Sequence, residues 1–327
     1  MASSGEYRYL FGPVRSRRMG RSLGIDLVPS KTCTYDCPYC QAGRTSLRTI
    51  ERRPYVPTVE VLAEFDRWLA TGEQADYITL SGSGEPTLHS EFGEILAGIA
   101  ARTPIRRALL SNGSLFSQSA VRAAACRAHV VKSSLSAWDQ ASFEAAHRPH
   151  PSLTFGVFLQ GLRDLRAEFA GEFWIEVFLM AGRNDALAQV ARIADLANSL
   201  GANRIQLNTV VRPPADSEAQ AVAASALDSL AKLFRPVAET LTGSTAVPHH
   251  APTDSAACQR AASAPDDDTA LARTILDVVR RHPSPAADLA AELRIDAQRL
   301  ATVLADMERR NVIRSEQRGA TRYYGPA

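Results

Sequence analysis

The chain has 327 residues, enough for one large domain or for two domains of unequal size. Apolar residues make up 45% and charged residues 22%, as in ordinary globular proteins, and the net charge of +2 is too small to indicate a polyanionic partner by itself. No segment approaches the about 20 consecutive apolar residues of a membrane helix, and residues 1–9 lack the pattern of a secretory signal. We therefore expect a cytoplasmic protein with no membrane partner, in which thiols stay reduced.

Short apolar runs alternate with amphipathic stretches from residue 24 onward. This alternation predicts six strands, each followed by a helix. Strands joined by crossover helices form parallel sheets, and six units are too few for a closed eight-stranded barrel. We therefore expect an α/β fold built as a partial (β/α)6 TIM-like barrel, with ligand-binding residues just after each strand. The expected strands are 24–28, 77–81, 107–111, 129–134, 174–179 and 204–208, and the expected helices are 59–70, 92–101, 119–125, 155–169, 187–200 and 219–241.

The last part of the chain has a different pattern. A segment rich in Ala, Ser, Pro and Thr ends in three aspartates and has little apolar periodicity. This composition is typical of a linker. Helical periodicity then returns and is followed by two short strands around Gly319, which is typical of a winged helix-turn-helix. We expect a barrel with an N-terminal extension at 1–242, a flexible linker at 243–268 and a winged-helix domain at 269–327. The expected elements of this domain are helices 270–281, 285–293 and 297–310 and strands 312–315 and 322–324.

Three of the five cysteines, Cys33, Cys37 and Cys40, fall within eight residues, which indicates metal ligation and not a disulfide framework. Three thiolates on one loop can hold three irons of a cubane cluster and leave the fourth iron open. This spacing favours a [4Fe–4S] cluster over a structural zinc site, which normally closes with four ligands. A zinc site completed from a distance and ordinary buried cysteines are the alternatives. We expect Cys126 and Cys258 to be ordinary thiols, and we expect no second cluster.

Two motifs together resemble the radical S-adenosylmethionine (radical SAM) superfamily. The first is the cysteine segment KTCTYDCPYCQ at 31–41, with Tyr39 just before its last cysteine, and the second is LSGSGEPT at 80–87, similar to the superfamily's GGEP segment. The resemblance implies a partial (β/α)6 barrel with a [4Fe–4S] cluster and S-adenosylmethionine (SAM) as cofactors. It also implies oxidoreductase chemistry, in which the reduced cluster cleaves SAM to a 5′-deoxyadenosyl radical.

The resemblance also implies contacts to SAM. Tyr39 would lie near the adenine, the GSGE backbone would receive the ammonium group, and Ser134 or Ser136 would contact the ribose. From their places at strand ends, Asn112 is either a ligand or a turn-forming residue, and Gln206 and Asn208 could close the pocket. The residues expected to bind the cofactor are Tyr39, Gly82, Ser83, Gly84, Glu85, Asn112, Ser134, Ser136, Gln206 and Asn208.

Other polar residues have open roles. Glu176 interrupts an apolar strand, where a carboxylate needs a partner, and it could point into the barrel. The HRPHP loop at 147–151 is either a substrate contact or simple surface. Four arginines before the first predicted strand form either a solvated face or a site for an anionic substrate or the cofactor carboxylate. They are Arg15, Arg17, Arg18 and Arg21.

Longer segments within 7–215, including HRPHPSL and QLNTVVRPP, are similar to an uncharacterised bacterial and archaeal branch of the superfamily. This branch is grouped loosely with wyosine-type tRNA-modifying Fe–S oxidoreductases. Wyosine-forming enzymes carry a second cluster on additional N-terminal cysteines. Because no cysteine precedes Cys33 in this sequence, we do not transfer that activity.

We expect a radical SAM enzyme that modifies a small molecule, a peptide or tRNA and takes electrons from a donor such as flavodoxin or ferredoxin. One alternative is a redox-sensing Fe–S regulator that binds DNA, and another is a zinc-binding structural protein. The GSGEP turn favours the enzyme, because neither alternative needs a cofactor cleft. The winged helix could bind nucleic acid, or dock a protein or peptide. Its arginines available for phosphate contacts are Arg299, Arg309, Arg310, Arg318 and Arg322.

Overall fold

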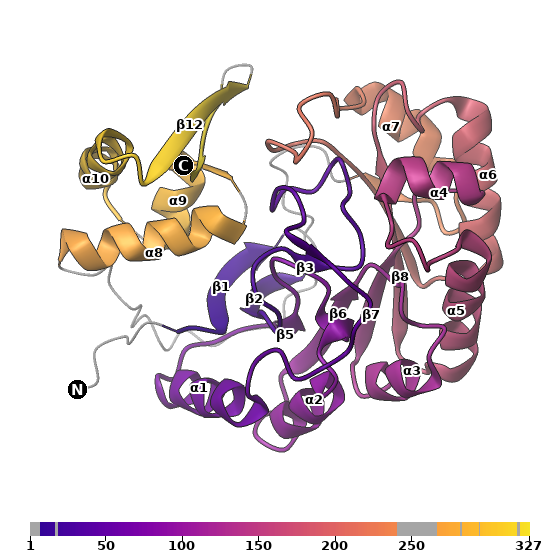
Figure 1. The fold of residues 1–327 in the computed structure, drawn as a ribbon, viewed down its shortest axis with the longest axis horizontal. Helices are drawn as coiled ribbons and strands as arrows, with labels where there is room; N and C mark the ends of the chain where they lie inside the picture. The colour runs from indigo at the N-terminus through magenta and orange to yellow at the C-terminus, as the bar shows by residue number, and fades with distance from the viewer. Residues whose placement is uncertain (1–6, 17–18, 241–266, 282, 294, 319–320) are drawn as a thin grey trace, which may run out of the picture.

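The computed structural model describes residues 7–16, 19–240, 267–281, 283–293, 295–318 and 321–327 (Figure 1). Most of the linker predicted at 243–268, with Cys258, lies outside these residues. None of the helices in the described ranges combines the length and the apolar run needed to cross a bilayer.

An eight-stranded sheet organises the first part of the chain. Six of its strands run parallel and follow one another across the sheet in chain order, with helices on the outer face (Figure 1). An antiparallel strand extends one edge and a short parallel strand the other. The expected partial (β/α)6 barrel is therefore confirmed. Across the sheet the strands are β1 (Leu10–Ser16), β2 (Gly20–Ile25), β5 (Tyr77–Leu80), β6 (Arg106–Ser111), β7 (Val130–Ser134), β8 (Glu172–Leu179), β9 (Arg204–Thr209) and β10 (Glu239–Thr240).

The helices pack apolar faces against the sheet. The first of them buries Val61, Phe65 and Trp68 on one side, as the 3.6-residue period requires. The helices of the barrel are α1 (Thr58–Ala70), α2 (Phe92–Ala100), α3 (Ser119–Ala125), α4 (Gln140–His147), α5 (Phe155–Glu168), α6 (Leu187–Ser199) and α7 (Ala224–Ala231), together with a 3₁₀ turn, η1 (Pro86–Leu88), and the short strands β3 (Thr32–Cys33) and β4 (Leu47–Arg48).

The helix predicted at 219–241 is wrong in its extent. Only Ala224–Ala231 is helical, and the chain then turns through Pro236, which has no N–H to continue a helix, before it enters β10. The prediction also lacks α4, whose only large apolar side chain is Phe143, and β1, which Gly12 and Pro13 interrupt.

The interior of the barrel is apolar at one end and polar at the other. Met19, Ala108, Val130 and Trp174 form a buried cluster towards the N-terminal ends of the parallel strands. Alternate residues of a strand point to the same face, so polar residues further along β7, β8 and β9 also face inward. Apolar side chains therefore fill the barrel near the N-terminal ends of its strands, and polar side chains line it near the carboxyl ends.

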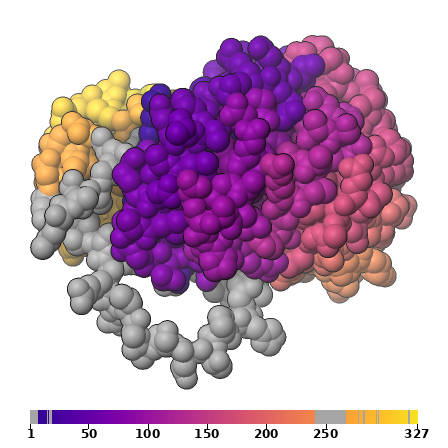
Figure 2. Space-filling model, turned by 90° about the horizontal axis from the view of Figure 1, so that it is seen from below, coloured from indigo at the N-terminus to yellow at the C-terminus, as the bar shows by residue number. Residues whose placement is uncertain are grey.

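The C-terminal elements lie beside the barrel (Figures 1 and 2). They have an apolar cluster of their own, which includes Leu271, Ile275, Leu289, Leu300 and Leu304. The helices lie close to the predicted ranges and a three-stranded sheet follows in the order β11-β13-β12. The elements are α8 (Asp268–Arg281), β11 (Ser284–Pro285), α9 (Ala286–Leu293), α10 (Ala297–Arg309), β12 (Ile313–Arg318) and β13 (Thr321–Pro326).

Candidate active site

The three clustered cysteines lie on the loop that follows β2, which we call the cysteine loop (residues 31–40). Each cysteine is partly exposed. Burial raises the pKa of Cys33 to about 12 and the pKa of Cys37 well above its usual range, and the negative charge of Cys40 raises both further. Three thiolates so close together are stable only with a cation between them. The donor set therefore fits an iron–sulfur cluster.

In the described part of the chain, no three His, Cys, Asp or Glu side chains gather closely enough to share one metal ion. A cubane cluster does not require its cysteines to meet at one ion, because each cysteine binds a different iron. The three sulfurs need only surround the space that the cluster occupies.

The cysteine loop is fastened to residues 82–85, which we call the glycine loop. The Lys31 amide donates to the Ser83 carbonyl at 3.1 Å, and the Glu85 amide donates to the Thr32 carbonyl at 3.1 Å. A Cβ atom at Gly84 would collide with that same Thr32 carbonyl oxygen. Glycine is therefore required here for the two loops to pack. The fold therefore brings the two motifs found in the sequence side by side.

Asp26, the first residue after β2, holds the glycine loop from below. Its carboxylate accepts hydrogen bonds from the Ser83 amide at 3.0 Å and the Ser83 hydroxyl at 2.7 Å. Gly82 has φ of +147°, and a Cβ atom there would collide with the Asp26 carboxylate. Asp26 was not among the expected site residues, because the strand predicted at 24–28 would continue through it, whereas β2 ends at Ile25.

Glu85 points away from the loop into the protein. Its carboxylate accepts from the Thr87 amide at 3.0 Å, the Ser111 hydroxyl at 2.8 Å and the Asn112 amide at 2.7 Å. Burial raises the pKa of this carboxyl, and the hydrogen bonds oppose that rise. Glu85 therefore joins the glycine loop to the end of β6.

Asn112 forms the turn considered for it, and its side chain also reaches the cysteine loop. Its Nδ2 donates to the Thr34 hydroxyl at 2.7 Å and lies 3.6 Å from the Cys33 sulfur, while its Oδ1 accepts from the Ser114 amide as in an Asx turn. At the end of β7, Ser134 is partly exposed. Ser136 is buried, and its hydroxyl accepts from the Phe178 amide at 2.8 Å.

Tyr39 lies against the carboxyl end of the sheet. Its ring stacks on Phe178 with the centroids 4.1 Å apart, and its hydroxyl is 3.0 Å from Nδ1 of His147. His147 ends α4 and is 1% exposed, and burial lowers its pKa to about 3, so the imidazole is neutral at physiological pH. The sequence analysis placed His147 in a loop; the structure places it at the end of a helix, within the site.

Inside the barrel, Lys132 Nζ pairs with Glu176 at 2.8 Å, and Asn208 Nδ2 lies 3.4 Å from the same carboxylate. Glu176 thus has the partner that its burial required, and Lys132 was missed because it sits in an apolar strand. Gln206 is buried and donates to Glu239 at 3.3 Å. Its own Oε1 is buried and makes no hydrogen bond within the described residues.

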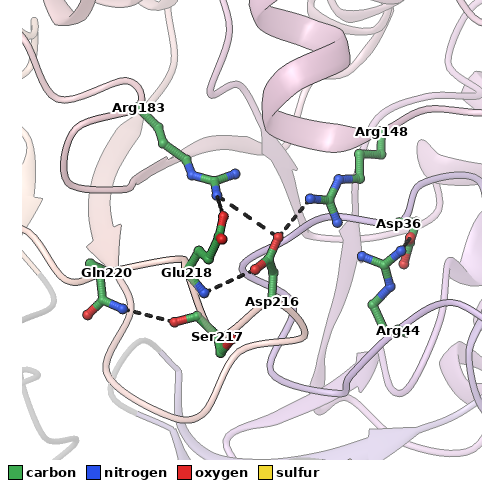
Figure 3. Close-up of polar contacts among 8 residues, drawn as sticks. All are labelled: Asp36, Arg44, Arg148, Arg183, Asp216, Ser217, Glu218 and Gln220. Atoms are coloured by element: carbon green, nitrogen blue, oxygen red, sulfur yellow. Dashed lines mark hydrogen bonds and ion pairs between the residues drawn. The ribbon is translucent and has the colours of Figure 1, made fainter.

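Residues 210–220 after β9, which we call the β9 loop, close one side of the site. The Asp216 amide donates to the Pro38 carbonyl of the cysteine loop at 2.9 Å. Arg148 and Arg183 converge on the Asp216 carboxylate (Figure 3), with Arg148 at 2.8 Å. The hydrogen bond from Arg148 lowers the pKa of Asp216. The β9 loop is therefore held against the cysteine loop.

Of the four arginines between residues 15 and 21, Arg21 is the one whose side chain the structure describes, and it does not lie at the site. Arg21 is exposed near the start of β2, at the opposite end from the cysteine loop, and its amide donates to Asp76. The side chain of Arg15 and residues 17–18 lie outside the described part.

The family model of the radical SAM superfamily matches residues 27–197. The chain belongs to the radical SAM superfamily, whose cofactors are a [4Fe–4S] cluster and SAM. Within it the chain belongs to the UPF0026 family: it is 32% identical over 208 residues to a UPF0026 protein of Synechocystis, covering 62% of this chain and 76% of that protein. The expected superfamily and cofactors are confirmed, and the grouping with wyosine-type enzymes stays a prediction.

Two further similarities are partial. The chain is 34% identical over 225 residues to a Brachyspira hyodysenteriae protein named GTPase Obg, covering 69% of this chain and 33% of that protein. The chain thus spans only a third of that relative. A radical SAM methyltransferase from Sphaerobacter thermophilus shares the fold, with a TM-score of 0.51 and 16% identity over 67% of this chain and 66% of that one.

Proposed function

We propose that Cys33, Cys37 and Cys40 hold a single [4Fe–4S] cluster and that SAM binds beside it, against the glycine loop. When bound, the reduced cluster supplies the electron that breaks a carbon–sulfur bond of SAM, and the 5′-deoxyadenosyl radical so formed modifies a substrate. The pair of backbone hydrogen bonds that locks the cysteine loop to the glycine loop carries this proposal. It puts a three-thiolate site and a backbone-lined turn side by side at the carboxyl end of the barrel, where ligands of such folds bind.

In this proposal the residues around the two loops position SAM. The backbone at Gly82, Ser83 and Gly84 faces the amino-acid end of SAM, while Asp26 and Glu85 keep that backbone in place. Tyr39 lies on the adenine side, fixed by Phe178 and His147. Asn112, Ser134 and Asn208 supply polar groups near the carboxyl ends of β6, β7 and β9, with the buried Ser136 and Gln206 beside them.

The β9 loop excludes water from the Tyr39 side of the site. It is fixed at Pro38 by a backbone hydrogen bond and at Arg148 by an ion pair. A dry, pre-ordered site protects a reactive radical from solvent and holds the substrate within reach of it.

For the C-terminal elements we propose a winged-helix domain that recruits the substrate, whether a small molecule, a peptide or tRNA. Arg299, Arg309 and Arg322 pair with acidic residues of the same part of the chain, at 2.9 to 3.1 Å. Such pairing leaves little concentrated positive charge for phosphates, which favours a peptide or protein ligand over nucleic acid. A one-electron donor of the flavodoxin or ferredoxin kind would reduce the cluster.

The proposal is tested by reconstituting the chain with iron and sulfide under anaerobic conditions and adding dithionite and SAM. We expect about four irons per chain and formation of 5′-deoxyadenosine. Cys37→Ser should abolish the nucleoside, whereas Cys126→Ser, which removes an exposed thiol at the end of α3, should not. A cluster-loaded chain that leaves SAM intact would overturn the proposal.

A further inference from the structure

Each sulfur of the cysteine loop has a polar side chain close to it, and the Cys37 sulfur has a second one in Tyr39. Nζ of Lys31 lies 3.2 Å from the Cys40 sulfur, Nδ2 of Asn112 lies 3.6 Å from the Cys33 sulfur, and Nδ1 of His147 lies 3.7 Å from the Cys37 sulfur. The Asn112 amide carries no charge, whereas Lys31 ends in an ammonium group. The environment of the three sulfurs is therefore unequal.

The backbone of Lys31 is held in an unusual conformation. Its φ is +62°, in the left-handed region that a side chain with a Cβ atom rarely adopts. The conformation is fixed from both sides, since the Lys31 amide donates to Ser83 and the Lys31 carbonyl accepts from the amides of Ser46 and Leu47, each at 3.1 Å. A glycine would adopt this conformation without steric cost. What lysine adds at this position is the ammonium group beside Cys40.

Lysine is scarce in this protein, which makes its use here notable. The chain has 37 lysines and arginines together, and the only lysines among them are Lys31, Lys132 and Lys232. Arginine has a wide planar fork, whereas lysine ends in a compact point charge that fits beside a single sulfur atom. Lys31 thus provides a compact charge next to the sulfur, in a protein whose other basic residues are nearly all arginines.

We infer that Lys31 donates a charge-assisted hydrogen bond to the Cys40 thiolate and raises the reduction potential of the cluster. Reduction transfers one electron from a one-electron donor to a cluster that already carries three thiolates. A cation 3.2 Å from one of these sulfurs stabilises the more negative, reduced state more than the oxidised state. The role is one of tuning, and the inference rests on the proposed cluster site.

Three variants test the inference by redox titration of the reconstituted protein, followed by electron paramagnetic resonance. Lys31→Gly suits the left-handed backbone and removes the charge, so it should fold and lower the equilibrium constant for reduction by about tenfold, or about 59 mV for one electron. Lys31→Arg keeps the charge and should recover most of the shift. Lys232→Ala makes the same change in net charge at an exposed site after α7 and should leave the potential unchanged. A potential in Lys31→Gly equal to that of the wild type would overturn the inference.

A second measurement needs no loss of the lysine. Reductive methylation with ¹³C-formaldehyde labels the three lysines and the amino terminus, and Lys31→Arg assigns the signal of Lys31. Assembly of the paramagnetic cluster should shift and broaden the Lys31 signal strongly and leave the Lys232 signal in place. An unmoved Lys31 signal in a chain with full iron content would overturn the inference alone. A wild-type chain that assembles no cluster would overturn the proposed function together with it.

Discussion

Glu85 is a buried carboxylate that connects two of the segments that form the site. It is 1% exposed, and its carboxylate ties the glycine loop to Ser111 and Asn112 at the end of β6. A buried carboxylate is unfavourable unless donors surround it, and here the donors come from both of the strand ends that it joins. The residue is therefore part of the support of the site, and its carboxylate is committed to protein donors.

Replacing Glu85 tests this support. In Glu85→Gln an amide group that cannot accept hydrogen bonds takes the place of one oxygen and leaves a buried donor unpaired, at a cost of about 1–3 kcal/mol. We expect the melting temperature to fall by a few degrees, at about 1–2 °C per kcal/mol for a chain of 327 residues. We also expect weaker SAM binding by calorimetry. Glu94→Gln, on the exposed side of α2, is the matched control, and equal melting temperatures for the two variants would contradict this role.

Site residues could be predicted from the sequence where they form a short motif. The three cysteines and the GSGE turn are such motifs, because their residues lie within a few positions of one another. Asp26, Lys132 and His147 do not form such motifs, because their partners lie 57, 44 and 110 residues away along the chain. Only the fold brings these pairs together, so no local pattern could indicate them.

At the level of elements, two loops and one helix build the site. The cysteine loop and the glycine loop pack so closely that no side chain fits at Gly84. Helix α4 carries His147 at its end and begins with a capping box, in which the Asp139 carboxylate accepts from the Ser142 amide at 2.9 Å. The start of α4 therefore helps to place a ring that contacts Tyr39.

The loop packing predicts the effect of a single methyl group. Gly84→Ala should push the Thr32 carbonyl away, which costs about 1–3 kcal/mol and displaces the cysteine loop. We expect reduced iron content after reconstitution and little nucleoside product. Gly156→Ala in α5 is the control, because a Cβ atom there meets nothing within 4 Å, and it should keep full iron content. Equal iron content in the two variants would show that the loops tolerate the methyl group.

The cap of α4 predicts a pH dependence. Hydrogen bonds from Ser142 lower the pKa of Asp139 in the folded state, so the folded state favours the carboxylate. This contribution is present above pH of about 4, the usual pKa of aspartate, and is lost as the pH falls through the lower folded value. Asp139→Ala should therefore be less stable than the wild type at pH 7 by about 1 kcal/mol, the usual contribution of an N-cap, and it should melt at a lower temperature. The difference in melting temperature between the two proteins should disappear in acid. A gap that widens below pH 4 would contradict this account.

The strands of the barrel were predictable because buried parallel strands appear as uninterrupted apolar runs. Elements held by tertiary contacts were not. β1 is recognisable only through its antiparallel pairing with β2, and the run of alanines and leucines after residue 219 continues a helical pattern past the point where the chain turns. Propensity alone does not mark these boundaries.

On the scale of the whole molecule, the C-terminal elements meet the barrel at the β9 loop. The Tyr323 hydroxyl donates to the Val211 carbonyl at 2.9 Å, and Arg212 pairs with Asp288 at 3.3 Å. The same loop contacts Pro38 of the cysteine loop a few residues further on. If the C-terminal elements recruit the substrate as proposed, they would hold it close to the cysteine loop.

This contact can be weakened without touching the site. Tyr323→Phe with Asp288→Asn removes one hydrogen bond and one ion pair, so we expect faster amide exchange in β13 and around Val211, with cleavage of SAM unchanged. Arg318→Gln, which breaks a pair within the β12–β13 hairpin, should leave exchange near Val211 as it is. Equal exchange near Val211 in both variants would show that the C-terminal elements do not contact the β9 loop in solution.

The central claim is that three cysteines hold a cluster whose fourth iron is open to SAM. Electron paramagnetic resonance of the reduced, reconstituted chain tests this most directly, because chelation of the open iron by the amino and carboxylate groups of SAM changes the spectrum of the cluster. We predict a clear change in the spectrum when SAM is added to the wild type, and no cluster signal in Cys33→Ser, Cys37→Ser or Cys40→Ser. A cluster spectrum that SAM leaves unchanged, or a cluster that survives loss of one of these cysteines, would contradict the account.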